Sequence, residues 1–182
     1  VDVMTGIPSI VAGLFAYALF ALIFGPAIRN GFIGSVALSV LMIPVVVRSS
    51  EEILRIVPNE LREASLALGV PKWLTVLKVV LPTSLAGLVT GVMLAVARVI
   101  GETAPLLIVA GFTTSTNYDL FNDRMMTLPV FVYTQYTQAA GLNAQDSIDR
   151  AWAGALALIL IVMLLNLAGR VVAKAFAPKY GR

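Results

Sequence analysis

The chain has 182 residues, of which 59% are hydrophobic and 13% charged, and its formal net charge is +3. Soluble domains are typically about 45–50% apolar and about 25% charged, so this sequence carries more apolar surface than a water-soluble fold buries. The chain contains no cysteine and no histidine, which excludes disulfides, thiolate chemistry, His-based catalysis and the usual transition-metal sites. The composition predicts an all-α polytopic membrane protein whose surplus apolar surface faces the lipid bilayer.

Four apolar stretches are candidates for membrane-spanning helices, which need roughly 20 residues to cross a hydrocarbon core of about 30 Å. They are residues 7–24, 31–47, 83–112 and 151–168. The second stretch is predicted to end at Arg48. The third contains Gly101 and Pro105, so we expect either one tilted helix or a helix followed by a re-entrant piece.

The charges between these stretches favour one orientation. Residues 48–82 hold five Lys/Arg and the tail after residue 168 holds four, whereas residues 113–150 hold two Lys/Arg and four Asp. By the positive-inside rule, the loop at 48–82 and the C-terminus are expected in the cytoplasm and the acidic segment outside. Within that outer segment, residues 128–140 are expected to form either an interfacial aromatic element or a packed external hairpin.

Residues 59–82 predict two short amphipathic helices on the inner face of the membrane. Apolar side chains recur there at helical spacing, namely at Leu61, Ala64, Leu68, Trp73, Leu74, Leu77 and Leu81. Asn59 is predicted as the N-cap, although Arg62 stands where a capping box would place Glu. Gly69 is the expected end of the first helix, and Pro71 fits the first turn of the second.

The same loop resembles the cytoplasmic signature of bacterial ABC importer permeases. That signature reads Glu-Ala-Ala, three residues, Gly, nine residues, then Ile-x-Leu-Pro. The matching residues here are Glu63, Ala64, Ser65, Gly69, Leu81 and Pro82, with Ser65 in place of the second Ala and Val79 in place of Ile. The resemblance implies a type I ABC importer permease fold in which residues 59–82 are the coupling loop that docks on a cytoplasmic ATPase subunit. Small Ala64 and Ser65 would permit close approach and Gly69 a tight bend; the alternative is an amphipathic surface helix without a partner.

Further stretches at residues 6–14, 44–52 and 98–106 are similar to the A-type permeases of phosphate-specific transport systems. The resemblance implies a single permease domain over residues 1–182 of a bacterial or archaeal plasma-membrane protein. Those permeases have six spans, so it also implies that the first two are missing, in agreement with a chain that begins at Val1 rather than Met.

The same resemblance implies a phosphate importer subunit that is not an enzyme and binds no cofactor itself. The chain lacks a Gly-x-x-x-x-Gly-Lys-Ser/Thr phosphate loop, so ATP and Mg²⁺ are expected on a partner. The implied partners are two copies of an ATPase subunit, a C-type permease and an extracytoplasmic phosphate-binding protein, with no nucleic acid.

Arg98 and Glu102 are the leading candidates for residues along the substrate path. They lie four residues apart, so one helical face is predicted for both, deep in an apolar stretch where a charge costs about 2.5 kcal/mol or more. Arg suits bidentate binding of phosphate oxygens, and Glu102 can accept a hydrogen bond from a protonated phosphate. The alternative is a self-satisfied structural pair.

Two neighbouring predictions complete the candidate path and the packing. The resemblance adds Thr103 to the path, and Arg48 is expected to anchor a helix end, with a substrate role as the alternative. Gly87 and Gly91 predict a close-packing face, either within the chain or against a second permease.

Two other functions stay open from the sequence. The chain can be a permease for another oxyanion, such as molybdate or sulfate. It can also be a channel or a membrane scaffold outside the ABC class. In the case of a channel, flux would not depend on ATP.

Overall fold

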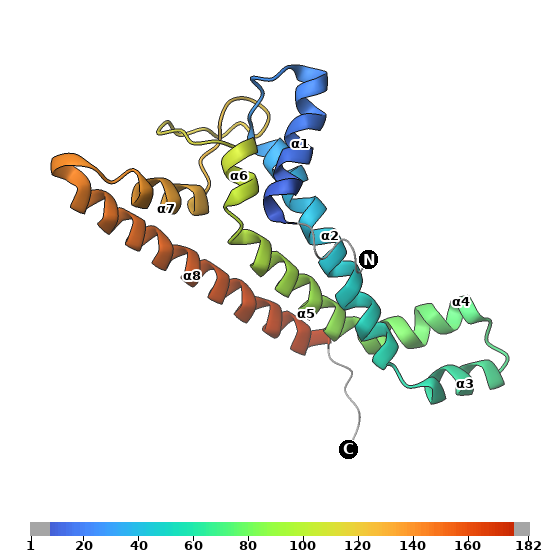
Figure 1. Ribbon diagram of the computed structural model, residues 1–182. Coiled ribbons are helices and arrows are strands. Elements are labelled where there is room, and N and C mark those ends of the chain that lie inside the picture. The colour runs from blue at the N-terminus through green and yellow to red at the C-terminus, as the bar shows by residue number, and fades with distance from the viewer. Residues whose placement is uncertain (1–7, 177–182) are drawn as a thin grey trace.

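In a computed structural model, residues 8–176 are described, and within that range the chain consists of helices and connecting segments without a β-strand (Figure 1). The all-α prediction is therefore confirmed for this part of the chain. The elements are α1 (Ser9–Phe24), α2 (Gly31–Ile56), α3 (Asn59–Ala67), α4 (Lys72–Thr75), the π-helical segment η2 (Val76–Val80), α5 (Leu81–Ile100), α6 (Ala104–Val109), α7 (Leu128–Thr137), the 3₁₀ turn η3 (Gly141–Asn143) and α8 (Ala144–Phe176).

Three continuous helices in this part of the chain are long and apolar enough to cross a membrane: Gly31–Ile56, Lys72–Ile100 and Ala144–Ala175. The first predicted span appears as α1, an apolar helix of 16 residues, just below the usual range of about 17–25. Within the described residues, each predicted apolar stretch contains a spanning or apolar helix, and the helices of the last three stretches extend well beyond the apolar run.

Arg48 does not end the second helix, contrary to the sequence prediction. The helix α2 continues to Ile56, with ion pairs between Arg48 and Glu52 at 2.8 Å and between Arg55 and Glu51 at 2.6 Å. Pairs at this i,i+4 spacing each stabilise an exposed helix by a few tenths of a kcal/mol, about 0.2–0.5. They let α2 extend beyond its apolar part as a charged helix.

The third predicted span is broken, which excludes the single tilted helix. The α5 helix ends at Ile100, and α6 begins at Ala104 after a short non-helical link. Pro105 is buried against α1, where a Cβ placed on Gly13 would lie 2.6 Å from the Pro105 Cα. This close contact between α1 and α6 holds the second piece in place.

The α5 helix packs between α2 and α8 (Figure 1). A Cβ on Gly87 would lie 2.8 Å from the Ile53 side chain, and one on Gly91 would lie 2.9 Å from Ser49 Oγ. The predicted packing face formed by Gly87 and Gly91 is confirmed, and its partner is α2 of the same chain. On the α8 side, Gly169 meets Met93 in the same way.

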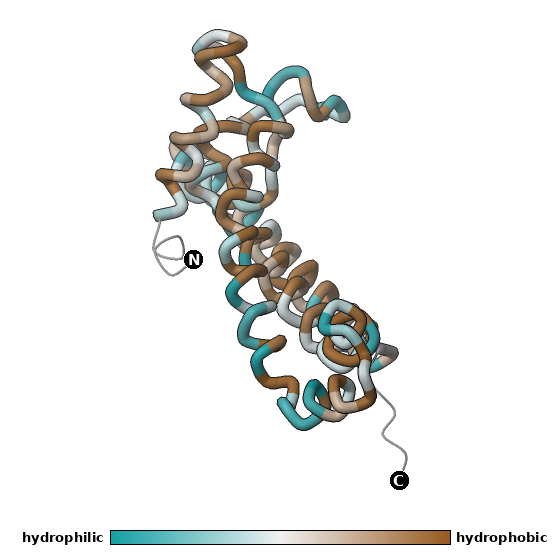
Figure 2. The backbone as a smooth tube through the Cα atoms, turned by 90° about the vertical axis from the view of Figure 1, so that its right-hand side faces the viewer, coloured by the Kyte–Doolittle hydropathy of each residue, from teal (hydrophilic) through white to brown (hydrophobic). Residues whose placement is uncertain are grey.

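The buried core is small and lies toward the end of the molecule that carries α1, α6 and α7. One cluster consists of Ala16, Ile33, Ala37 and Val109, and a second of Leu106, Ala110 and Val130. In contrast, only 6% of the apolar window of α8 is buried. Figure 2 shows hydrophobic segments along the helices and hydrophilic ones at the loops and in the α3–α4 region, as expected for helices that face lipid.

Candidate functional site

The sequence signature maps onto a hairpin made by α3 and α4, which projects beyond the ends of α2 and α5 (Figure 1). We call residues 59–75 the α3–α4 hairpin. The candidate path residues Arg98, Glu102 and Thr103 lie at the opposite end of α5. The two candidate sites are thus joined by one continuous helix, Lys72–Ile100.

The hairpin begins differently from the sequence prediction. Asn59 is not the N-cap: Pro58 precedes the helix, Asn59 is its first residue, and no side chain caps it. Arg62, the residue that broke the expected capping box, instead donates from Nη2 to the carbonyl oxygen of Leu54 at 2.8 Å. It thereby satisfies one of the last carbonyl groups of α2 and ties α3 to that helix.

Gly69 ends α3 as predicted. Its φ is +76°, a left-handed conformation that glycine adopts at little cost. The Gly69 N–H donates to the Leu66 carbonyl at 2.9 Å and the Val70 N–H donates to the Ser65 carbonyl at 3.2 Å, the paired bonds of a Schellman motif. No atom lies within 4 Å of a hypothetical Cβ, so backbone conformation alone requires glycine here.

Ser65 faces the inside of the hairpin. Its hydroxyl lies 3.0 Å from Thr75 Oγ1 in a hydrogen bond, and both side chains are buried. Glu63 and Ala64 are exposed on the other side of α3. Ser65 therefore holds α3 to α4, while Glu63 and Ala64 are available to a partner. The sequence analysis missed Thr75, because a buried threonine carries no signal apart from its partner.

The second short helix predicted from the sequence is not separate. The α4 helix continues through η2 into α5, so one helix runs from Lys72 to Ile100. The π-helical segment ends at Val80, two residues before Pro82, whose missing N–H and ring disturb the α-helical bonding of the preceding turn. Two hydroxyl groups make additional bonds in the same turn, since Thr83 donates to the Val79 carbonyl at 2.6 Å and Ser84 to the Val80 carbonyl at 2.9 Å. The Leu81-Pro82 part of the signature thus marks a helix irregularity beside the hairpin.

Arg98 and Glu102 do not share a helical face, which corrects the sequence prediction. Arg98 lies in the last turn of α5 and is exposed, whereas Glu102 follows the helix end and is half-buried. No ion pair joins them within residues 8–176. The Glu102 N–H donates to the Val99 carbonyl at 3.1 Å. The two side chains are therefore not a self-satisfied pair, and each is free to meet a third group.

Thr103 lies in the link between α5 and α6, and its carbonyl accepts from the Leu107 N–H at 3.0 Å. Arg98, Glu102 and Thr103 thus lie at the break between α5 and α6, where the backbone leaves helical hydrogen bonding. Arg48 lies elsewhere, on the extension of α2, with its Nε 2.8 Å from Glu52 Oε1. The structure does not bring Arg48 into the same group.

Asn30 organises the loop between α6 and α7, at the end of the molecule opposite the hairpin. The sequence analysis missed this role. Its side chain accepts from the Ile33 N–H at 3.0 Å and donates to the Phe121 carbonyl at 2.7 Å, and the residue is 5% exposed. In the same loop, Asp119 accepts from the Phe121 N–H and the Asn122 side chain, which lower the pKa of its carboxyl group. An asparagine directly before an apolar helix is an N-cap signal that could have indicated the first of these bonds.

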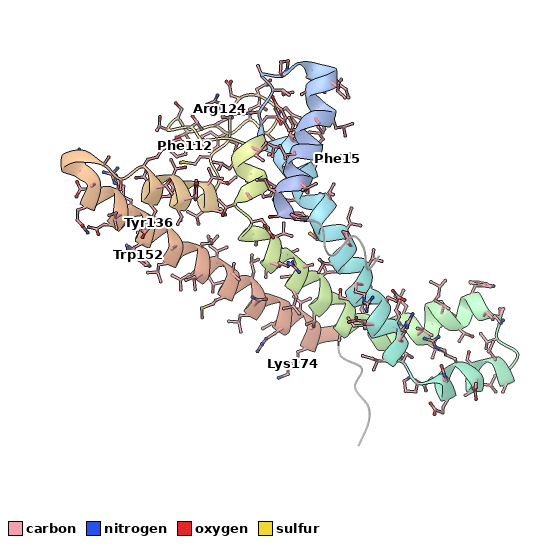
Figure 3. The ribbon with its side chains drawn as sticks, viewed as in Figure 1. Phe15, Phe112, Arg124, Tyr136, Trp152 and Lys174 are labelled. Carbon is pink, nitrogen blue, oxygen red and sulfur yellow. The ribbon has the colours of Figure 1, made fainter. Side chains whose placement is uncertain are left out.

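Residues 128–140 contain α7, which packs along α8 and buries Val130 and Thr134. The predicted outer element is therefore a helix packed in a hairpin with α8, and it also exposes Tyr133 and Tyr136. Figure 3 shows Tyr136 and Trp152 near one end of α8 and Lys174 near its other end. Aromatic side chains thus gather at one end of this helix and a basic side chain lies at the other.

Some sequence predictions lie outside the described residues. They are the start of the 6–14 stretch, at Gly6 and Ile7, and two of the basic residues of the tail, Lys179 and Arg182.

The whole chain, residues 1–182, matches the protein family described as the binding-protein-dependent transport system inner membrane component. Among curated proteins, the phosphate transport system permease protein PstA of Mycobacterium leprae is 48% identical over 171 residues, which cover 93% of this chain and 54% of that protein. The protein of the same name from Yersinia pestis is 39% identical over 181 residues, which cover 98% of this chain and 57% of that protein. The chain spans about half the length of these relatives.

Among solved structures, a chain of the MetNI methionine ABC transporter in an inward-facing conformation superposes with a TM-score of 0.75. The superposition covers 97% of this chain and 72% of the other, at 23% sequence identity. At that identity the likeness shows the fold alone, which is the fold of an ABC importer permease.

Proposed function

Because the chain belongs to the family of binding-protein-dependent transport system inner membrane components, we propose that it is the membrane-spanning permease subunit of an ATP-driven importer of inorganic phosphate. In this role it forms part of the path of the ion and passes on movements of a separate ATPase subunit. It performs no chemical step itself, so it is not an enzyme and holds no cofactor; ATP and Mg²⁺ belong to the ATPase.

The observation that carries the proposal is the 48% identity to a phosphate permease over 93% of the chain. A match of that extent takes in both the α3–α4 hairpin and the break between α5 and α6. Similarity that covers the coupling element and the candidate path together supports a shared substrate more strongly than similarity of either segment would.

For the coupling step, we infer that Glu63, Ala64 and Gly69 dock on the ATPase, with Leu81 and Pro82 connecting the docked hairpin to the spanning helix. The exposure of Glu63 and Ala64 supports this role. Because Lys72–Ile100 is one helix, a push on the hairpin can move the break that carries Arg98. Nucleotide shifts this equilibrium only by binding one of the two states more tightly than the other.

For the substrate path, we infer that Arg98, Glu102 and Thr103 meet phosphate at the break between α5 and α6. An exposed guanidinium that has no carboxylate partner within the described chain can bind phosphate oxygens in a bidentate manner. Glu102 would accept a hydrogen bond from the protonated form of the ion, a bond that sulfate at neutral pH does not offer. Arg48, on the α2 extension, is assigned to anchoring rather than to the path.

The proposed location is a bacterial or archaeal plasma membrane, with the α3–α4 hairpin and the C-terminus in the cytoplasm. The cluster of basic residues in 48–82 supports this orientation. The proposed partners are two ATPase subunits, a C-type permease beside this chain, and an extracytoplasmic phosphate-binding protein at the loop that Asn30 holds.

The test is ATP hydrolysis by the full-length complex in liposomes. Phosphate-loaded binding protein is compared with the corresponding binding proteins loaded with sulfate or molybdate. Stimulation by phosphate alone is the expected result. Stimulation by another oxyanion would instead assign the chain to a permease for that ion.

A second arm measures phosphate flux with an ATPase subunit that cannot hydrolyse ATP. Sustained flux should stop, because nucleotide that is bound but not hydrolysed holds the permease in the state to which it binds more tightly. Flux that continues would identify a channel and overturn the importer mechanism.

A further inference from the structure

A polar pocket of about 330 Å³ lies in the loop between α6 and α7, at the end of the molecule opposite the α3–α4 hairpin (Figure 3). We call it the loop pocket. Three hydroxyls, one amide, one carboxylate and one guanidinium line it, from Thr113, Ser115, Thr116, Asn117, Asp123 and Arg124. Its volume is in the range of small-ligand sites, about 300–1,000 Å³.

Arg124 is held in place by the fold of the loop. The Asn117 side chain donates to its carbonyl oxygen at 3.2 Å, and the next N–H, of Met125, donates to the Ala110 carbonyl at 3.1 Å. The side chain of Arg124 lies over Gly111, where an added Cβ would be 3.2 Å from the Arg124 Cδ. Gly111 has a φ of +73°, so glycine suits both the turn and the close approach of the arginine.

The donors of the loop pocket are not used by the chain itself. The Arg124 guanidinium and the hydroxyls of Ser115 and Thr116 make no hydrogen bond or ion pair within residues 8–176. The Thr113 hydroxyl accepts from the Ser115 N–H at 3.2 Å, which leaves its own hydrogen to donate. A guanidinium beside several hydroxyl donors is suited to binding the oxygens of an oxyanion.

Asp123 gives the loop pocket a basis for selectivity. Its carboxylate repels an anion without a proton, such as sulfate at neutral pH, but accepts a hydrogen bond from an oxyanion that carries one. Asp119, the other acid of the loop, does not line the pocket and already accepts from the Phe121 N–H at 2.9 Å and from Asn122 at 2.6 Å. Arginine, carboxylate and hydroxyl are also the groups at the break between α5 and α6.

We propose that the loop pocket is an outer binding site for protonated inorganic phosphate. Arg124 and the hydroxyls of the pocket bind the phosphate oxygens, and Asp123 accepts a hydrogen bond from the proton of the ion. In the proposed orientation this loop lies outside the membrane, and only the short helix α6 separates it along the chain from the break. The inference rests on the proposed function, because the pocket receives the ion before it reaches Arg98.

The test measures phosphate binding by the full-length complex in nanodiscs, without binding protein and without other accessible cysteines. An environment-sensitive dye on Tyr118→Cys reports binding, since Tyr118 is 93% exposed in the same loop and does not line the pocket. Arg124→Gln should raise the phosphate concentration that gives half of the signal about tenfold, because charge-assisted hydrogen bonds are lost at a site open to water.

Arg150→Gln is the matched control for Arg124→Gln. Arg150 is an exposed arginine of the same outer segment but does not line the pocket, so its replacement should leave the half-maximal concentration unchanged. An equal increase in both variants would mean diffuse attraction to basic residues and would overturn the site.

Replacement of the carboxylate tests the selectivity. Sulfate should compete with phosphate about tenfold or more weakly, because the carboxylate offers it no donor. Asp123→Asn should narrow this difference, since an amide can donate to either ion. Asp123 has a φ of +62°, which asparagine also adopts readily, so the loop should keep its fold. Equal competition by the two ions in the unchanged pocket, or an unchanged difference in Asp123→Asn, would overturn the assignment to protonated phosphate.

Phosphate uptake by the same preparations separates this inference from the proposed function. Arg98→Gln should lower uptake but keep the dye signal, and loss of the signal would assign it to the path rather than to the pocket. Uptake by the unchanged complex without a dye signal would overturn the outer site alone. A dye signal without phosphate uptake would overturn the proposed function and support the site.

Discussion

Gly69 sets the turn between α3 and α4 through its backbone conformation. Because its φ is +76° and no atom lies near a hypothetical Cβ, Gly69→Ala should introduce strain without a clash. We expect a loss of about 1–2 kcal/mol of stability, the cost of a left-handed conformation for a residue with a Cβ. Because the turn presents Glu63 and Ala64, we also expect weaker stimulation of ATP hydrolysis by phosphate-loaded binding protein.

Gly141→Ala is the matched control for this prediction. Gly141 also has a positive φ, +73°, and open space around a hypothetical Cβ, but it lies beside α7, far along the chain from the hairpin. The control should lose similar stability and keep full stimulation of ATP hydrolysis. Equal loss of stimulation in both variants would attribute the effect to stability rather than to coupling.

Arg98 is the residue on which the proposed path depends most. Arg98→Gln should lower phosphate uptake roughly ten- to a hundredfold, the range for losing hydrogen bonds to a charged group worth about 1.5–3 kcal/mol. Phosphate uptake by Arg98→Lys should lie between that of the unchanged protein and that of Arg98→Gln, because lysine keeps the charge but loses bidentate geometry. Uptake of radioactive phosphate into proteoliposomes gives the measurement.

Arg170→Gln provides the comparison for Arg98, since Arg170 is also an exposed arginine near the end of an apolar helix. It should leave uptake close to normal. Normal uptake in Arg98→Gln would remove this residue from the path, while the coupling role of the hairpin would stand.

Residues differ in how much of their role is visible in the sequence. Gly69 was predicted correctly because a glycine after a short amphipathic run acts through local conformation. Arg62 and Ser65 were not understood, because their roles depend on the Leu54 carbonyl and on Thr75, which only the folded chain brings to them. The shared face of Arg98 and Glu102 failed for a similar reason, since spacing cannot show that α5 ends between them.

For the helices too, the sequence predicts only part of the structure. Apolar runs predicted where helices lie but not where they end, because charged pairs extend α2 and the periodicity of α4 continues into α5. Where α4 continues into α5, the main feature is the π-helical segment η2. There the Leu81 N–H donates to the Val76 carbonyl, five residues back rather than four.

Pro82→Ala should remove the cause of this irregularity. It restores a backbone N–H and relieves the ring clash, so α-helical bonding can extend through Val76–Val80. Shifting the register by one residue would turn the hairpin by about 100° relative to α5, given 3.6 residues per turn. We expect a folded protein whose phosphate-dependent ATP hydrolysis is strongly reduced.

The rotation can be measured by the distance between spin labels on Leu68→Cys and Tyr118→Cys, since the chain has no cysteine of its own. Pro71→Ala is the control, because Pro71 precedes α4 and interrupts no helical bond. An unchanged distance in Pro82→Ala would mean that the π-helical segment is set by packing rather than by the proline.

At the scale of the whole molecule, the separation of interfacial side chains along α8 matches the thickness of a membrane. Trp152 and Lys174 lie 22 residues apart, which corresponds to about 33 Å of helix and matches a hydrocarbon core of about 30 Å. Aromatic residues collect at interfaces and basic residues on the cytoplasmic side. The small core and the large exposed apolar area mean that lipid and partner subunits, rather than internal packing, cover most of the apolar surface.

The orientation of the whole molecule gives the last prediction. Leu68 and Tyr118 are 83% and 93% exposed, one on the hairpin and the other in the loop held by Asn30, and both tolerate substitution on that ground. In intact cells, a membrane-impermeant maleimide should label Tyr118→Cys in the full-length protein and should reach Leu68→Cys only after the membrane is opened. Within residues 1–182 the introduced thiol is the only target, because this sequence contains no cysteine.

The two cysteines control for each other, because similar exposure makes any difference in labelling a difference of side. The reverse pattern would place the hairpin outside, where no nucleotide-hydrolysing subunit could reach it, and the coupling mechanism would fail. Labelling of both from outside would mean that the chain does not separate two compartments. The expected pattern places the hairpin, with Glu63 and Ala64 exposed on it, on the side where ATP is available.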